Sequence, residues 1–186
     1  MTTAEYNPWY GHTYEVIQEL ADWRTFSRDI PKKVMCIYSW MPQTLMSVKH
    51  AGGGTKWSAF SLEDIERLTK TVDSEFAAVQ SLELQKANLE ELEGSLRNIA
   101  SVLFPPFGPV AMSKYLHFSA PTLFPMWDRR IRSSRKHAAT VDGYLEYMRV
   151  FKEELMEASN MEKALSQYPS NAVRGWDIVN MMRRAA

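Results

Sequence analysis

Prolines and one glycine divide the middle of this 186-residue chain, so that no uninterrupted helix can span residues 103–136. The turn at 104–108 contains two prolines and ends at Gly108. Proline lacks a backbone N–H and glycine readily takes a positive φ, so this turn should end one helix and let another begin. A second proline-bounded turn at 121–127 then leads to Asp128. The sequence therefore predicts two helix breaks, each followed by a new helix start.

Elsewhere the apolar residues recur at helical spacing, and no convincing period-two strand pattern is present. A Ser61 capping box predicts a further helix start, with Leu62, Ile65 and Leu68 on one face. The other expected helices cover 13–26, 34–48 (interrupted or restarted at Pro42), 76–103, 110–118, 142–158 and 172–184. A chain of this length can bury one sizeable core. We therefore expect an all-α fold, with one compact helical domain over 1–186.

Bulk composition excludes several classes of protein. The net charge is zero, which argues against a protein that coats nucleic acid through bulk electrostatics. No apolar run has the length of a membrane span, and the N-terminus does not resemble a signal peptide. Cys36 is the one cysteine, which excludes a disulfide framework and a cysteine metal site. We expect a monomeric, cytoplasmic protein without membrane contact.

Charge is nevertheless unevenly distributed along the chain. Between 113 and 137 a single acid, Asp128, stands among basic residues: Lys114, Arg129, Arg130, Arg132, Arg135 and Lys136. Such a cluster favours a local phosphate contact, although a chance surface fluctuation also explains it. The glycine-rich loop at 50–56 lacks the spacing of a P-loop and is better explained as a connector.

Asp128 follows Pro125-Met-Trp at the expected start of a helix. Aspartate is a favoured N-cap, so a structural role accounts for it without any chemistry. A carboxylate beside a basic, phosphate-binding segment also suits chemistry on a nucleotide. The two roles do not exclude each other, and Trp127 is expected to pack beneath the acid.

These residues resemble the helix-hairpin-helix DNA glycosylases, whose hairpin typically reads Leu-Pro-Gly-Val-Gly and is followed by an essential aspartate. Phe104-Pro-Pro-Phe-Gly108 stands at the hairpin, and Asp128 lies twenty residues beyond Gly108, the interval usual in that family. Leu123-Phe-Pro-Met-Trp-Asp-Arg-Arg-Ile131 resembles the family's apolar-Pro-apolar-apolar-Asp-x-x-Val stretch. The resemblance implies an enzyme that turns a base out of double-stranded DNA and hydrolyses its N-glycosidic bond, with Asp128 as the catalytic carboxylate.

The resemblance also bears on strand cleavage. Members that cut the strand carry a lysine two residues after the hairpin glycine, and Val110 stands there in this chain. We therefore expect base removal alone, leaving an abasic site. Lys114 lies one turn further along the same helix face. Three roles are open for it: contact with phosphate or solvent, a nucleophile displaced from the usual position, or a structural role. His117 is expected to be a packed or hydrogen-bonded helix residue.

Two departures from the family pattern affect the backbone amides that would bind a DNA phosphate. Pro106 replaces the first hairpin glycine and Pro109 follows the last, and each removes an amide donor. Arginine side chains after Asp128 are expected to compensate. The predicted DNA-contacting residues are Phe107, Gly108, Lys114, Arg129, Arg130 and Arg132. The family's hairpin often holds a monovalent cation, which is the one cofactor allowed for here; no metal site is expected.

Reading an extruded base requires aromatic surfaces and a few polar groups. The first third of the chain is rich in aromatic residues, most of which would be expected to fill the core. The candidate base-pocket residues are Trp9, Tyr10, Trp40 and Gln43. The target is either ordinary DNA damage or a bulky modified base of a virus genome.

Two other accounts remain open. In one, the same hairpin belongs to a non-catalytic nucleic-acid-binding protein. In the other, the chain is a helical interaction protein whose basic patch meets an acidic partner.

Overall fold

The computed structural model describes residues 8–40, 60–129, 131–132 and 136–185, and the backbone alone at 8–11, 40 and 182–185. The described residues form helices and no strand, which confirms the all-α expectation for that part of the chain. The helices are α1 (Pro8–Leu20), α2 (Ile30–Trp40), α4 (Leu62–Lys70), α5 (Asp73–Val79), α6 (Leu89–Ser119), α8 (Val141–Met156), α9 (Ala158–Gln167) and α10 (Ala172–Ala185). Among them, none combines the length and the apolar character needed to cross a bilayer.

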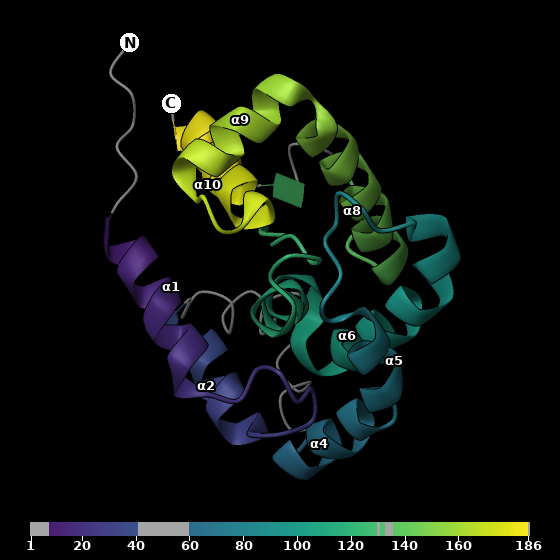
Figure 1. The fold of residues 1–186 in the computed structure, drawn as a ribbon. Coiled ribbons are helices and arrows are strands. Elements are labelled where there is room, and N and C mark those ends of the chain that lie inside the picture. Colours follow the sequence, from purple (N-terminus) through teal and green to yellow (C-terminus); the bar gives the residue numbers. More distant parts are fainter. Residues whose placement is uncertain (1–7, 41–59, 130, 133–135, 186) are drawn as a thin grey trace.

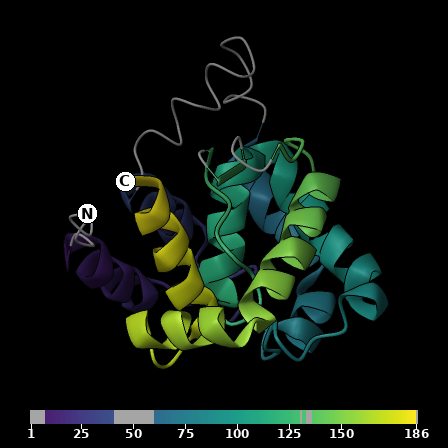
Figure 2. The same cartoon turned by 90° about the horizontal axis from the view of Figure 1, so that it is seen from above.

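Helix α6 occupies the middle of the molecule, with α1 and α2 on one side, α4 and α5 below, and α8 to α10 above (Figure 1). The turned view shows α8, α9 and α10 following one another as three sides of a U (Figure 2). Buried apolar residues from all these helices form one hydrophobic cluster. The second half of α6 supplies its centre, because residues 111–119 are all buried.

Helix α6 is two helices joined at Gly108, whose φ of 66° and ψ of 175° lie outside the helical region. Its first half begins at an Asn88 cap, whose side chain accepts the Glu90 N–H. Only glycine adopts this backbone conformation at low cost, so the chain bends here and resumes a helix at once. The predicted break at Gly108 and the predicted helix over 110–118 are both confirmed. The predicted turn over 104–107 is wrong, because these residues, with Pro105 and Pro106, continue the first helix up to Gly108.

The Ser61 capping box is confirmed as well. The Ser61 hydroxyl accepts the Asp64 N–H at 3.1 Å, and the Asp64 carboxylate accepts the Ser61 N–H at 3.0 Å. The expected buried face is wrong in part, because Leu62 remains exposed whereas Ile65 and Thr69 are buried. Helix α4 therefore packs on a face rotated away from the one that Leu62 suggested.

Several helix boundaries differ from the sequence-based expectation. Helix α1 begins at Pro8 rather than at residue 13, and α2 begins at Ile30 rather than at residue 34. The first helix ends at Leu20 rather than at residue 26, because the Asp22 carboxylate accepts the Arg24 and Thr25 N–H groups and turns the chain. The expected helix 76–103 is divided, since Leu84 N–H donates to the carbonyl of Thr122 and draws the chain out of helix between α5 and α6. Helix α9 was not expected at all.

The Gly108 conformation can be tested by adding a single methyl group. We expect Gly108→Ala to destabilise the protein by about 1–3 kcal/mol, because alanine is strained at this φ and ψ. The matched control is Gly94→Ala in the first half of α6, where an added Cβ meets nothing within 4 Å. That variant should be more stable than wild type by roughly 0.5–1 kcal/mol. Urea unfolding measures both, and a Gly108→Ala protein as stable as wild type would contradict the assignment.

Candidate active site

Residues 124–127, here called the presenting segment, carry the chain from the end of α6 into Asp128. The segment is buried and has neither helix nor strand pairing, so its backbone groups need other partners. Side chains supply them from three helices. His117 Nδ1 lies 2.7 Å from Phe124 O, Tyr144 Oη donates to Pro125 O at 2.9 Å, Asp177 Oδ2 accepts Met126 N–H at 3.2 Å, Tyr147 Oη donates to Met126 O at 3.0 Å, and Ser113 Oγ accepts Trp127 N–H at 2.9 Å. The path of the chain into Asp128 is therefore fixed from several directions.

Trp127, the residue before the acid, is packed in the core. Its side chain is fully buried, with ring centroids 5.6 Å from Tyr144 and 6.0 Å from Tyr147. The guanidinium of Arg132 lies 5.9 Å from the Trp127 ring centroid, in the range of a cation–π contact. Trp127 thus joins the segment before Asp128 to the helical turn after it.

Asp128 is the N-cap of that helical turn. Its Oδ1 accepts the Ile131 N–H at 2.6 Å, and its carbonyl accepts the Arg132 N–H at 3.0 Å. The side chain is half-buried. The cap role is confirmed, and it holds the carboxylate at the surface end of a rigid segment.

Ser113 connects the helix that begins after Gly108 to the presenting segment. Its hydroxyl donates to the carbonyl of Val110 at 2.9 Å and accepts the Trp127 N–H. One hydroxyl therefore links the first turn after Gly108 to the residue before Asp128. The start of this helix and the residue before the acid are therefore held together.

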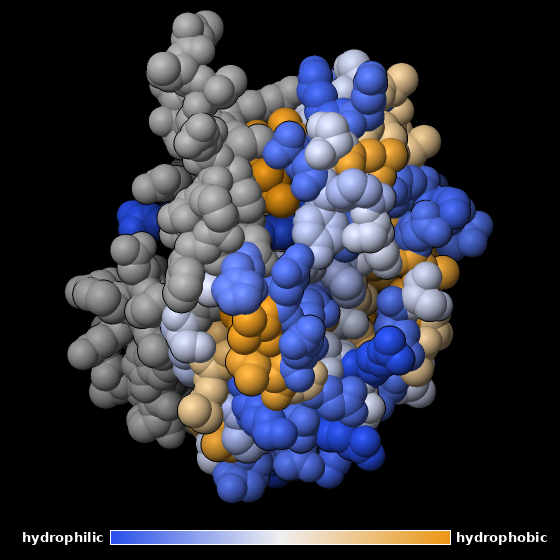
Figure 3. All heavy atoms as spheres, turned by 60° about the vertical axis from the view of Figure 1, so that its left-hand side comes forward, coloured by the Kyte–Doolittle hydropathy of each residue, from blue (hydrophilic) through white to orange (hydrophobic). Residues whose placement is uncertain are grey.

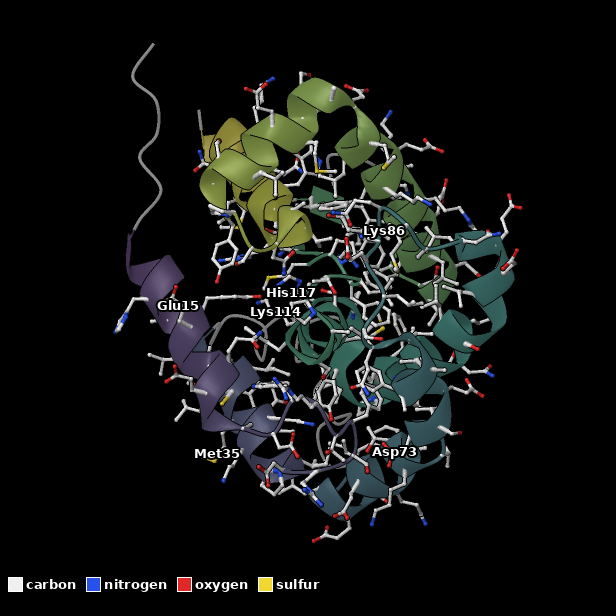
Figure 4. All side chains as sticks on the ribbon, in the orientation of Figure 1. Glu15, Met35, Asp73, Lys86, Lys114 and His117 are labelled. Carbon is white, nitrogen blue, oxygen red and sulfur yellow. The ribbon has the colours of Figure 1, made fainter. Side chains whose placement is uncertain are left out.

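Lys114 follows Ser113 on α6 and lies near Asp128. Its side chain is 2% exposed, so the expectation that it extends to solvent or to a surface phosphate is wrong for this structure. Burial lowers the pKa of Lys114 to about 7, and the opposing effect comes from the negative charge of Asp128. Lys114 and His117 lie close together near the centre of the molecule (Figure 4).

His117 is packed and hydrogen-bonded, as the sequence suggested. A carbonyl can only accept, so Nδ1 carries the proton toward Phe124 O and Nε2 accepts from the Tyr14 hydroxyl at 2.9 Å. Burial, and then the nearby Arg174, lower the pKa of His117 to about 3. The imidazole is neutral near pH 7 and serves as a structural link between α1, α6 and the presenting segment.

Sequence reasoning missed the buried polar face of α10. Arg174, Asp177 and Asn180 are each at most 4% exposed, and they project from a helix that is buried over 172–180. The Arg174 guanidinium lies 4.3 Å from the Tyr14 ring centroid. The available signal in the sequence was the pair Arg174 and Asp177, which stand three positions apart among mainly apolar residues. Such a pair indicates buried charges with specific partners.

The predicted DNA-contacting residues occupy different environments. Phe107 is 1% exposed, with its ring centroid 5.6 Å from that of Tyr115, so its side chain belongs to the core and offers no surface to DNA. Gly108 is half-buried, Arg129 is exposed and Arg132 is half-buried. Arg130 lies outside the described residues, as do Gln43 and the side chains of Trp9, Tyr10 and Trp40.

The surface on the α1 side carries hydrophobic residues in small areas separated by hydrophilic ones (Figure 3). Within the described ranges, no group of three or more His, Cys, Asp or Glu residues is placed to hold a metal ion. Comparison of the chain with protein-family models, with curated proteins and with solved structures gives no match.

The neutral state of His117 has a consequence for acid stability. Its pKa of about 3 lies below the ordinary value of 6.5, so unfolding takes up a proton between these pH values and stability falls as the pH falls. We expect His117→Gln to lose less stability than wild type between pH 6.5 and 4. The control is His12→Gln, at an exposed position of α1, which should follow wild type. Thermal unfolding over this pH range measures the difference, and parallel curves for the His117 variant and wild type would contradict it.

Proposed function

We propose that the protein is a helix-hairpin-helix DNA glycosylase that hydrolyses the N-glycosidic bond of a damaged or modified base. The observation that carries the proposal is the placement of Asp128. The carboxylate is half-buried at a helix start, and the segment before it is hydrogen-bonded through its backbone to side chains of α6, α8 and α10. Such rigid support suits a group that must meet a substrate atom within a fraction of an ångström.

The chemistry needs one well-placed negative charge. As the bond between base and sugar breaks, its electron pair leaves with the base and positive charge develops on the sugar. The Asp128 carboxylate stabilises that charge, while water adds to the sugar carbon and its released proton neutralises the base that left with the electron pair. The products are the free base and an abasic site. Because Val110 occupies the position of the strand-cleaving lysine, the enzyme is monofunctional.

The hairpin and the residues after Asp128 serve double-stranded DNA. The bend at Gly108 would let the backbone approach a phosphate with no side chain between them. Arg129, which is exposed, and Arg132, which is half-buried, follow the acid in the chain and would bind phosphates through their guanidinium groups. A bent duplex with one nucleotide turned out would bring its sugar to Asp128.

Asp128→Asn tests the proposal directly, because asparagine also caps a helix and keeps the shape of the side chain. We expect the variant to fold and bind DNA normally, while base release falls roughly 100- to 1,000-fold. Incubation with DNA carrying assorted damaged and modified bases, followed by mass spectrometry and alkaline cleavage, measures the release. The same panel separates repair of damage from removal of modified virus bases.

A second capping residue provides the matched control for this experiment. Thr140 caps α8 by accepting the Gly143 N–H at 3.0 Å, and Thr140→Ala should cost about 1 kcal/mol of stability with activity unchanged. Full turnover by Asp128→Asn would reject the catalytic role of Asp128. DNA binding by the wild-type protein without release of any base from the panel would instead favour the non-catalytic DNA-binding protein.

Charge reversal tests the DNA contact separately. We expect Arg129→Glu to weaken binding of any duplex sequence and to reduce the slope of log K against log salt by about one phosphate contact or more. Lys163→Glu, at an exposed position of α9, makes the same charge change away from the candidate site and should have a much smaller effect. Fluorescence anisotropy at several salt concentrations measures both. Equal salt slopes in the three proteins would show that Arg129 does not contact DNA.

A further inference from the structure

The buried carboxyl group of Asp177 is the part of the candidate site that the proposed chemistry leaves unused. Asp177 lies on α10 and is 1% exposed. Its Oδ2 accepts the N–H of Met126, two residues before Asp128, and is 3.9 Å from His117 Nδ1. Among the residues that the structure describes, its Oδ1 has no hydrogen-bond partner. Buried unsatisfied oxygens are rare in native proteins, so this one requires an explanation.

We propose that Asp177 is a positioning residue for Asp128, and that it acts as a neutral carboxylic acid. The inference rests on the proposed function, because it assigns Asp177 a part in the same site. The Met126 bond is the connection, since it joins the last helix to the presenting segment across 51 residues of sequence. Asp177 acts through the backbone and does not itself touch the substrate.

The neutral state follows from the surroundings of the carboxyl group. Charged and titratable groups face it from every neighbouring element: Arg174 from α10, Tyr14 from α1, His117 from α6, Tyr144 from α8, and Asp128 from the helical turn. Arg174 favours the ionised form, and so does the Met126 N–H. Burial is the largest influence on the pKa of Asp177 and favours the neutral form, and the negative charge of Asp128 acts in the same direction. Together they outweigh Arg174 and the Met126 N–H, so that the pKa of Asp177 is raised to about 8.

The geometry agrees with a neutral group. An ionised carboxylate would leave one charged oxygen buried without a donor, which costs far more than a neutral oxygen in the same place. A neutral Asp177 still accepts the Met126 N–H through Oδ2. In this form Asp177 also adds no negative charge to the surroundings of Asp128.

Three variants separate this role from ordinary packing. Asp177→Asn keeps both the acceptor and the neutral charge, whereas Asp177→Leu removes the acceptor at similar size. Asn160→Leu is the control, because Asn160 is also buried and donates to the carbonyl of Glu154, away from Asp128. The readouts are the single-turnover rate of base release, KM for DNA, and hydrogen exchange at the Met126 and Trp127 amides.

We expect Asp177→Asn to stay within about threefold of wild type in rate and KM. Asp177→Leu should lose roughly 100-fold in rate with KM nearly unchanged, as expected of a small displacement of Asp128. Its Met126 and Trp127 amides should exchange faster, and Asn160→Leu should lose stability without losing rate. A slow Asp177→Asn protein, or a fast Asp177→Leu protein, would overturn the proposal.

A measurement on the wild-type protein covers the case in which Asp177→Leu does not fold. The carboxyl carbon of Asp177, assigned by its absence from Asp177→Asn, should show the NMR shift of a protonated acid at pH 6. An ionised shift at that pH would overturn the proposal. The NMR and exchange readouts do not require turnover, so failure to release any base from DNA would reject the glycosylase function without deciding the role of Asp177.

Discussion

The hydrogen bonding of the presenting segment is the constraint on which the rest of the site depends. Residues 124–127 are buried without regular structure, so each backbone polar group would lose its bond to water with no replacement. Leaving one such group unbonded costs roughly 1–3 kcal/mol, and the segment has several. Side chains of α6, α8 and α10 replace these bonds to water with hydrogen bonds to the backbone of the segment. The position of Asp128 is therefore a product of the whole helical arrangement rather than of its local sequence.

Burial also orders the charges around the site. His117 and Asp177 lie in the interior, where the uncharged form of each is favoured. Lys114 is buried too, and its pKa falls to about 7 even with Asp128 nearby. Asp128 alone of these groups is half-buried at the surface end of the segment. The proposed function requires a carboxylate in such a place, at the end of a buried segment and not itself fully buried.

The elements that could be predicted from the sequence were those set by local chemistry. The break at Gly108, the capping box at Ser61, and the cap at Asp128 each depend on residues within a few positions. Boundaries set by distant contacts were missed. The division between α5 and α6 depends on Thr122, whose hydroxyl donates to the carbonyl of Leu82, and that pairing leaves no local trace in the sequence. The same limit explains why Lys114 and Phe107 were expected at the surface although both are buried. Helical spacing shows which residues share a face of the helix, but not which other elements cover that face.

Gly175 shows how far from Asp128 the site can be disturbed. A side chain at this position would place its Cβ 1.9 Å from the carbonyl oxygen of Ala164, so α10 approaches α9 as closely as backbone permits. Any larger residue must push the two helices apart, and Asp177 would move with α10 away from Met126. A position without a reactive side chain is thus expected to tolerate exchange poorly. Variation at residue 175 would change the packing that supports Asp128 from behind, not the exterior of the protein.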